Sequence, residues 1–444
     1  MAEDTGIPKR DARYRAHVDR LRERTGQLLA ENGYDRLLLH SGRGRARFQD
    51  DYEPPFRAHP HFVAWLPLPR NPDCLLEVRP GCTPRLWLYA PDDFWHAAPA
   101  EPEAWWADHF DIAIVRDTGE WQHALEETVA TALIADPADF PALGRHAELN
   151  PPELLRGLDE LRTVKSDWQI ACIQAANGVA AAGHRAAERA FRDGASELEI
   201  HLAYLEAAGQ DPDRLPYGSI VCLNEHAAVL HYQRRDAAPP AKSRSFLIDA
   251  GADCHGYAAD VTRTHARDAG AFADLVEAVD SMQQRLASRM QAGRSFVDLN
   301  VEAHRGVAEI LRGASLCDMP LDAMLEAGVT STFLPHGLGH FLGVQVHDVA
   351  GRVAADGRAL PPPAGHPALR LTRELESGNV VTVEPGLYFI PSLLAKLRSS
   401  PLSAHFDWSA IDALVPFGGI RIEDDVVVRP ERPDNLTRAA LDGI

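Results

Sequence analysis

Hydrophobic residues recur every three to four positions in some stretches of the chain and form short continuous runs in others. This pattern predicts alternating helices and strands. In the N-terminal third, it predicts helices over residues 14–31 and 124–135 and strands over residues 36–39, 62–66 and 84–89. Such alternation is typical of an α/β layered domain. A further helix is predicted over residues 152–161, before a polar joint near Lys165.

The pattern changes beyond this joint, so we divide the chain into an N-terminal domain of residues 1–164 and a C-terminal domain of residues 165–444. Ser196 and Glu199 form a capping-box motif that should open a helix running toward Ala208. The other predicted elements are helices over residues 167–192 and 296–312, strands over 219–223, 245–250, 256–264, 380–384 and 419–428, and loops over 351–369 and 391–409. Helices and strands in blocks predict an α+β domain rather than a nucleotide-binding βαβ fold.

Composition and charge narrow the class of protein. The 444 residues are 45% hydrophobic and 25% charged, which is typical of a folded protein with two domains. Lys and Arg number 45 against 64 Asp and Glu, a net charge of −19, so we expect no binding to nucleic acid or to an anionic membrane. The first ten residues do not resemble a secretion signal, which predicts a cytoplasmic protein. Six cysteines without a CxxC pair are interpreted as reduced core residues.

Acidic residues interrupt runs that otherwise read as buried strands. Asp249 ends one apolar run and Asp260 lies in the next. A hairpin turn centred between Cys254 and His255 would place the two aspartates directly opposite each other, with Cβ atoms about 4.5 to 5.5 Å apart. One Asp alone is commonly a turn residue. Two buried carboxylates at this distance would repel each other unless a cation neutralised them.

Further acids and histidines extend this set. Glu384 follows the apolar run in NVVTVEPG, and Glu423 lies in the predicted strand GIRIEDD. The glycine-rich segment FLPHGLGHFLGVQVHD contains His336, His340 and His347. A single such residue is more commonly solvated or structural, but oxygen ligands together with imidazole favour divalent ions such as Mn²⁺. Bridging carboxylates would hold two ions about 3.5 to 4 Å apart and activate a shared water, so the pattern indicates a dinuclear metallohydrolase.

These residues resemble a known family. The ordered contexts IDAG, DVTRT, PHGLGH, VEPG and GIRIED resemble the pita-bread metallopeptidases, which include methionine aminopeptidase, aminopeptidase P and prolidase. The bacterial type of Xaa-Pro dipeptidase and its relative organophosphorus acid anhydrolase are the nearest match, and residues 40–67 extend the resemblance into the N-terminal part. The resemblance implies an α+β fold in which an N-terminal α/β domain precedes a pita-bread (creatinase/aminopeptidase-like) domain.

The resemblance also implies roles for the acidic residues and histidines. Asp249 would bind one metal ion, Asp260 and Glu423 would bridge both ions, and His340 and Glu384 would complete the second coordination sphere. Glu384 would also shuttle the proton of the attacking water. His347 would be catalytic by contacting the substrate and steadying the tetrahedral intermediate.

Four other residues match substrate-binding positions of the family. They are His231 in LHYQ, His336, Tyr217 and Arg421. A planar Arg side chain can bind a carboxylate through two parallel hydrogen bonds, which suits the C-terminus of a dipeptide. Arg421 could instead pair with a neighbouring acid, and Tyr217 could be a core residue. Asp424 and Asp425, which follow Glu423, are interpreted as solvated or as supporting the ligands.

The implied activity is hydrolysis of dipeptides with a C-terminal proline by a bridging hydroxide on two divalent ions per subunit. Mn²⁺ is expected, with Co²⁺ or Zn²⁺ as alternatives. The resemblance further implies a homodimer in which the N-terminal domain dimerises and forms the active-site rim, its Gln49–Asp51 loop reaching into the partner's site, and it leaves open whether Asp50 or Asp51 points inward. An aminopeptidase P, a non-catalytic binding protein and a side activity on organophosphates remain alternatives or additions.

Overall fold

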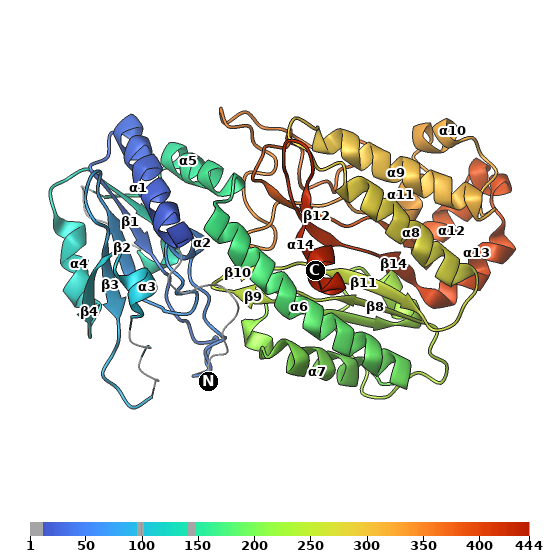
Figure 1. Cartoon of the computed structure of the whole chain (residues 1–444), viewed down its shortest axis with the longest axis horizontal. Coiled ribbons are helices and arrows are strands. Elements are labelled where there is room, and N and C mark those ends of the chain that lie inside the picture. The colour runs from blue at the N-terminus through green and yellow to red at the C-terminus, as the bar shows by residue number, and fades with distance from the viewer. Residues whose placement is uncertain (1–11, 96–98, 100–101, 141–146, 444) are drawn as a thin grey trace. The chain divides into compact units, whose positions relative to one another are not determined.

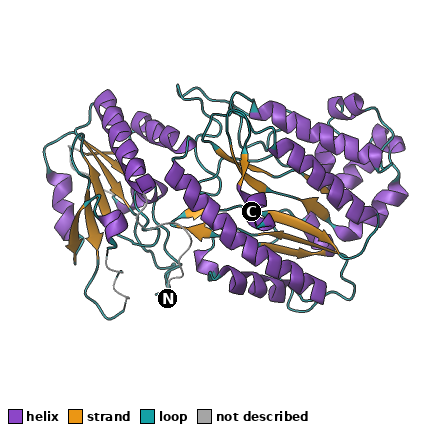
Figure 2. Ribbon diagram, viewed as in Figure 1, coloured by secondary structure: helices purple, strands orange, loops and turns teal. Residues whose placement is uncertain are grey.

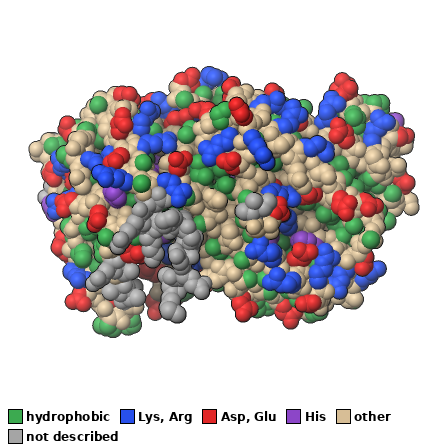
Figure 3. All heavy atoms as spheres, viewed as in Figure 1, with side chains coloured by type: hydrophobic (Ala, Val, Ile, Leu, Met, Phe, Trp, Pro, Cys, Tyr) green, Lys and Arg blue, Asp and Glu red, His purple; other side chains and the backbone are tan. Residues whose placement is uncertain are grey.

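The computed structural model of the chain describes residues 12–95, 99, 102–140 and 147–443. The first ten residues, on which the expectation of no secretion signal rests, lie outside this part. Two compact units divide the described chain, one up to Cys172 and the other from Ile173 onward (Figure 1). Among the described residues, no helix is both long enough and apolar enough to cross a membrane. On the face drawn in Figure 3, acidic and basic side chains are interspersed.

The N-terminal unit contains a mixed six-stranded sheet with the strand order β4-β3-β2-β1-β5-β6. Its strands are β1 Arg36–His40, β2 Leu75–Val78, β3 Arg85–Tyr89, β4 Asp111–Val115, β5 Thr131–Ile134 and β6 Ala147–Leu149. Its helices are α1 Ala12–Asn32, α2 Pro60–Val63, α3 Ala104–Ala107, α4 Gly119–Gln122 and α5 Pro152–Thr163. The expected α/β layers are confirmed, since helices accompany a sheet that pairs strands in both directions (Figure 2).

A buried charge lies at the centre of this sheet. Arg36 is fully buried on β1 and donates to Thr131 Oγ1 at 2.7 Å and to Glu77 Oε1 at 3.2 Å. It also donates to the carbonyl of Ala124. These partners satisfy the guanidinium, as a buried charge requires. The polar network therefore ties β1, β2 and β5 together inside an otherwise apolar core.

Two predictions for this unit are wrong. Residues 62–66 lie in and just after the short helix α2 rather than in a strand, because Pro60 stands in its first turn and the His59 side chain caps its N-terminus. Residues 124–135 contain a 3₁₀ turn and then the buried strand β5 rather than a helix. Leu and Ala fit both structures, so the apolar spacing could not distinguish between them.

The C-terminal unit places antiparallel strands between two groups of helices. Its sheets have the orders β11-β8-β7 and β12-β15-β16, and β13 pairs with β14 and β9 with β10. The strands are β7 Ile220–Leu223, β8 Ser245–Asp249, β9 Asp253–Cys254, β10 Tyr257–Ala258, β11 Thr262–Ala266, β12 Val380–Val383, β13 Gly386–Tyr388, β14 Gly419–Arg421, β15 Asp424–Val427 and β16 Asp434–Asn435. An isolated antiparallel bridge pairs Thr262 of β11 with Glu423, which lies between β14 and β15.

Two apolar cores hold the helices of this unit against the strands. One core joins α6 and α7 to β7 and β8, and the other joins α8 and α9 to strands that include β12 and β14. The helices are α6 Asp167–Asp193, α7 Glu197–Ala208, α8 Ala271–Ala287, α9 Phe296–Gly313, α10 Leu321–Glu326, α11 Thr330–Phe333, α12 Pro391–Arg398, α13 Trp408–Leu414 and α14 Leu436–Asp442. The predicted helices α6, α7 and α9 are confirmed, including the capping box at Ser196.

Of the two predicted loops, one is confirmed and the other is wrong. Residues 351–369 are irregular, as expected. Residues 391–409 are largely helical, because Pro391 occupies the first turn of α12 and a 3₁₀ helix follows. Helix α8 was not predicted, although Phe272, Leu275 and Val279 begin its buried stripe at helical spacing. Five of the six cysteines are buried as expected, whereas Cys82 is exposed.

Burial of His17 should make the N-terminal unit sensitive to acid. Its Nε2 lies 2.8 Å from the carbonyl of Ala64, its Nδ1 lies 2.9 Å from Ser166 Oγ, and its ring stacks on Trp168. Burial lowers the pKa of His17 from 6.5 to about 4. The unfolded chain therefore takes up a proton as the pH falls below 6.5, while the folded chain stays neutral until about pH 4.

We therefore expect this histidine to remove about 3 kcal/mol of stability between pH 7 and pH 4. Chemical denaturation at a series of pH values would measure it, with His17→Gln as the comparison, because Gln can keep both polar contacts but does not titrate. The free energy of unfolding of the variant should fall less steeply with acid. Equal slopes for the two proteins would contradict the assignment.

Candidate metal centre

The C-terminal unit brings acidic residues from separate strands together. Asp249 ends β8, Asp260 lies between β10 and β11, and Glu423 lies between β14 and β15. Glu384 directly follows β12, and His340 lies in the glycine-rich segment that bridges to β12. All five of the residues expected to bind metal therefore come from strand ends or the segments next to them.

The hairpin between Asp249 and Asp260 has a different register from the predicted one. Its two-residue turn consists of His255 and Gly256, whose φ angles of 54° and 87° are those of a tight hairpin turn. Asp249 consequently lies opposite Thr262 and not opposite Asp260. Because the shift amounts to two residues, both aspartates still point to the same face, as diagonal neighbours.

Three of the predicted ligands form a compact buried group. Asp260, His340 and Glu423 each offer one ligand atom, and these atoms all lie within 4.8 Å of one another. Their exposed fractions are only 5%, 3% and 2%. Glu384 is adjacent, because His340 Nε2 lies 3.5 Å from both Glu384 Oε1 and Asp260 Oδ2. Four predicted ligands are thus gathered around one imidazole edge.

The orientation of His340 suits a ligand. Its Nδ1 lies 2.9 Å from the carbonyl of Phe341, which can only accept, so Nδ1 carries a proton and Nε2 faces the carboxylates. The backbone on both sides is held against β12, and a side chain on Gly339 would place its Cβ 2.1 Å from the carbonyl of Thr382. Only glycine allows this close approach.

Asp249, the fifth predicted ligand, is held by an arginine. Arg421 Nη2 donates to Asp249 Oδ2 at 2.7 Å, and its Nη1 donates to the hydroxyl of Tyr388 at 2.9 Å. Arg421 therefore pairs with an acid in this structure, which is the alternative weighed for it. The other oxygen of Asp249, Oδ1, is buried and has no hydrogen-bond partner among the described residues.

The pKa values of the group show that its carboxylates need positive charge nearby. Burial and the negative charges around it raise the pKa of Glu423 well above its ordinary value. Burial likewise raises the pKa of Glu384 to about 7. Burial alone would lower the pKa of His340, but Asp260 and Glu384 raise it to about 9. The group would therefore bind protons, or another cation, to offset its charge.

The donor set fits divalent metal ions. It consists of carboxylate oxygens and one imidazole nitrogen, which hard or borderline divalent ions prefer. The unpartnered Oδ1 of Asp249 supplies a further buried acceptor without a donor. The residues that could hold metal are Asp249, Asp260, His340, Glu384 and Glu423.

The expected substrate residues lie around this group. The rings of His340 and His347 are 4.4 Å apart, and Tyr217 donates to Asp260 Oδ1 at 2.6 Å. His336 Nε2 lies 2.9 Å from the hydroxyl of Tyr388. His231 is exposed in the segment between β7 and β8. Burial is the main cause of the lowered pKa values of His336 and His347, and the charge of His231 is one of several smaller contributions.

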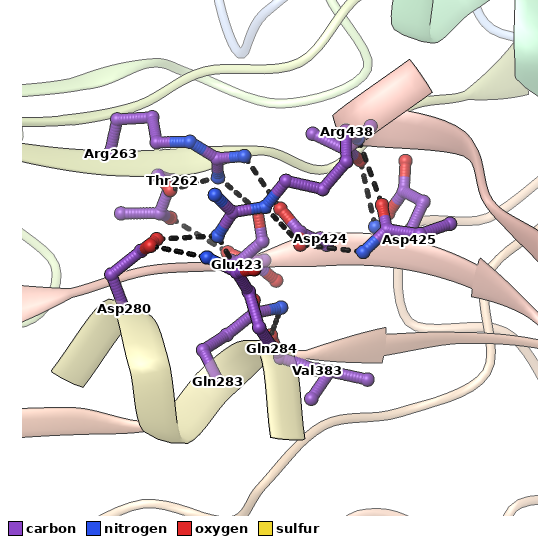
Figure 4. Close-up of polar contacts among 12 residues, drawn as sticks. Thr262, Arg263, Asp280, Gln283, Gln284, Val383, Glu423, Asp424, Asp425 and Arg438 are labelled. Atoms are coloured by element: carbon purple, nitrogen blue, oxygen red, sulfur yellow. Dashed lines mark hydrogen bonds and ion pairs between the residues drawn. The ribbon is translucent and has the colours of Figure 1, made fainter. Parts of the chain in front are cut away.

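Polar residues behind the ligands fix Glu423 and its strand (Figure 4). Thr262 Oγ1 donates to Glu423 Oε2 at 2.7 Å, and Arg263 donates to the carbonyl of Glu423 at 2.8 Å. Arg263 also donates to Asp424 at 2.6 Å, and Arg438 donates to the other oxygen of Asp424 at 2.9 Å. Asp424, the first residue of β15, thus links this strand to β11 and to the C-terminal helix α14.

Asp425 supports Asp260 in the same way. Its Oδ2 accepts from the backbone N–H of Asp260 at 3.0 Å and from Asn177 Nδ2 at 2.8 Å. Both Asp424 and Asp425 are fully buried, so the interpretation that they are solvated is wrong and the supporting one is right.

The sequence reasoning missed Thr262, Arg263 and Tyr388 as parts of this region. For Tyr388 a signal existed, because it lies four residues after Glu384 and alternation along an extended chain places both on one side. For Thr262 and Arg263 the signal was the polar run DVTRT inside an apolar strand pattern.

Comparison with known proteins identifies the family to which the chain is similar. Residues 171–430 match the model of metallopeptidase family M24, and residues 12–159 match that of the Xaa-Pro dipeptidase N-terminal domain. An Xaa-Pro dipeptidase of Pseudoalteromonas atlantica is 42% identical over 439 residues, covering 96% of this chain and 97% of that protein. One from Pectobacterium atrosepticum is 46% identical over 432 residues, covering 96% of this chain and 97% of that protein.

Solved structures show the same fold. Aminopeptidase P from E. coli, in complex with the inhibitor Pro-Leu, superposes with a TM-score of 0.73 at 21% identity, covering 96% of this chain and 95% of that one. The expected pita-bread architecture with a separate N-terminal domain is therefore confirmed. The family match spans more than half of the chain and includes every predicted metal ligand. The chain belongs to metallopeptidase family M24, with the N-terminal domain found in Xaa-Pro dipeptidases.

Proposed function

We propose that the protein is an Xaa-Pro dipeptidase, a metal-dependent hydrolase that cleaves dipeptides with a C-terminal proline. The observation that carries the proposal is the buried group of Asp260, His340 and Glu423 beside Glu384. It occurs in a chain whose relatives named Xaa-Pro dipeptidase match almost its whole length. The amide bond before proline lacks an N–H, which general peptidases handle poorly.

Two divalent ions would be held by the five predicted ligands, with Asp260 and Glu423 shared between them. We propose Mn²⁺, because oxygen donors with one imidazole suit it. When bound, such ions activate water and polarise the substrate carbonyl. Asp424, Asp425, Thr262 and Arg263 would keep the ligands in place through the hydrogen bonds described above.

Glu384 is the residue best suited to move the proton. Its Oε1 lies 3.5 Å from His340 Nε2, so its carboxylate stands beside the group that would hold the attacking water. It would receive a proton from the attacking water and return it to the proline nitrogen. His347, whose ring lies next to that of His340, would contact the substrate carbonyl.

The C-terminal carboxylate of the dipeptide would meet His231 and Arg421, with His336 and Tyr217 beside it. Among the described residues, no ion pair to His231 is found, so it can bind a carboxylate directly. Arg421 is engaged by Asp249 and Tyr388, so a bound dipeptide would have to share or replace one of these contacts.

We propose a cytoplasmic homodimer, with a dimerising N-terminal domain of residues 1–164 and a catalytic domain of residues 165–444. In this dimer the Gln49–Asp51 loop would complete the rim of the partner's active site. Light scattering on the purified protein measures the oligomeric state.

Replacement of a ligand should remove metal and activity together. We expect Asp260→Asn and His340→Ala to lose most bound metal and at least about 100-fold in kcat, because the first removes a carboxylate charge and the second an imidazole nitrogen from the buried group. Metal analysis, kinetics with Ala-Pro and circular dichroism are the measurements. Asp356→Asn, in an exposed loop, is the matched control and should behave as the wild type. Full activity in either ligand variant would rule out the assignment.

The length of the substrates that are cleaved distinguishes an Xaa-Pro dipeptidase from an aminopeptidase P. A carboxylate-binding site at His231 and Arg421 rejects a chain that continues beyond proline, so Ala-Pro should be cleaved and Ala-Pro-Ala should not. Proline release is measured with Mn²⁺ and again with a chelator, which should abolish it. Cleavage of the tripeptide would favour an aminopeptidase P, and cleavage of neither would favour a non-catalytic binding protein.

A further inference from the structure

Glu197 is a buried carboxylate outside the metal centre. It is the first residue of α7 and is only 1% exposed. Its side chain faces the segment of residues 223–236, which we name the His231 loop because that histidine lies within it. The inference drawn from this contact rests on the proposed function, which assigns His231 to the substrate carboxylate.

Four donors from the His231 loop converge on Glu197. Its Oε1 accepts from the backbone N–H of Leu223 at 2.8 Å and lies 2.7 Å from His226 Nδ1. Its Oε2 accepts from the hydroxyl of Tyr232 at 3.0 Å and from the backbone N–H of Asp236 at 2.9 Å. The donors come from both sides of His231, so one carboxylate holds the two halves of the loop together.

Two other contacts reinforce this closure. The ring of His226 stacks on that of Tyr232 at 4.5 Å between centroids. The backbone N–H of Leu198, the next residue of α7, donates to the carbonyl of Asp236 at 3.2 Å. Tyr232, which directly follows His231, is thus fixed by both a hydrogen bond and a ring contact.

The cluster of Glu197, His226 and Asp236 also has the residue types of a cation site. The hydrogen bonds decide against that interpretation, because both oxygens of Glu197 already accept two donors each. A carboxylate with this pattern serves as a hydrogen-bond anchor. Its burial inside the protein also makes the loss of an acceptor costly for the donors left behind.

We infer that Glu197 is a positioning residue that fixes the His231 loop, and with it His231, for binding of the substrate carboxylate. Other contacts of the loop are those of Asn224 to the backbone of Arg244 and Ser245, of Arg235 to the carbonyl of Ser219, and of Ala227 and Tyr232 in a small apolar cluster. Glu197 acts through His231 and does not itself contact the substrate.

Glu197→Gln tests this inference, with Glu199→Gln as the matched control. Both changes remove a negative charge from the first turn of α7. Only Glu197 contacts the loop, since Glu199 bonds to the backbone and hydroxyl of Ser196 at 2.8 Å. In Glu197→Gln, the side-chain amide replaces one acceptor oxygen with an NH₂ donor, which would face two other donors.

The expected result is a KM for Ala-Pro at least about tenfold higher in Glu197→Gln, with kcat changed less than about threefold and metal content unchanged. Trypsin should cut the loop after the exposed Arg234 faster than in the wild type. The Glu199→Gln control should match the wild type in both respects. Tyr232→Phe removes one of the four hydrogen bonds and should show a smaller change in the same direction, which keeps the test valid if Glu197→Gln does not fold.

An unchanged KM in Glu197→Gln, with or without faster cutting, would overturn the inference, as would equal effects of Glu199→Gln. These results are distinguishable from failure of the proposed function. If the wild type cleaves Ala-Pro, the proposed function stands and the variants test the inference alone. If the wild type cleaves no Xaa-Pro dipeptide, the proposed function is wrong and the inference falls with it.

Discussion

Repulsion among buried carboxylates is the main electrostatic constraint on the candidate metal centre of the C-terminal unit. Asp260, Glu384 and Glu423 surround one edge of His340, and Asp249 lies on the same face as Asp260. Carboxylates removed from water at these distances cannot all be ionised without positive charge nearby. Arg421 offsets part of the charge by pairing with Asp249, and a protonated His340 would offset a further part, while burial raises the pKa of both Glu384 and Glu423. This repulsion lowers the stability of the folded protein, and a bound cation would offset the loss.

The rest of the unit keeps this unfavourable group in place. Two apolar cores pack helices against the strands next to the ligands, and an antiparallel bridge pairs Thr262 with Glu423. Behind them, Asp425 accepts a hydrogen bond from the backbone N–H of Asp260, and Asp424 accepts one from the side chain of Arg263. The same device recurs at Glu197, where a buried carboxylate holds a loop by accepting hydrogen bonds from its backbone and side chains. Rigidity here comes from buried acceptors matched to donors.

The sequence allowed the candidate ligands to be found because an acid inside an apolar run is a local anomaly. Asp249, Asp260, Glu384 and Glu423 were visible in this way, and the glycines around His340 marked a close approach. The hairpin register was not visible, because it depends on His255 and Gly256 adopting positive φ angles, and the predicted centre was one residue away. Pairings such as Arg421 with Asp249, 172 residues apart, need the fold itself. The predictions for two short segments were wrong because their residues fit both a helix and a strand. These segments are residues 62–66, which lie in and after α2, and residues 124–135, which include β5.

If charge repulsion in this group is offset by bound cations, metal must bind the folded chain far more tightly than the unfolded one. The thermal unfolding midpoint of the wild-type protein, stripped of metal and then titrated with Mn²⁺, measures this directly. We expect the midpoint to rise with metal concentration and to approach saturation as the ligands are filled, while Asp260→Asn shows little rise. A midpoint that does not respond to divalent ions would contradict the account, since the buried carboxylates would then have to be stabilised by protons alone.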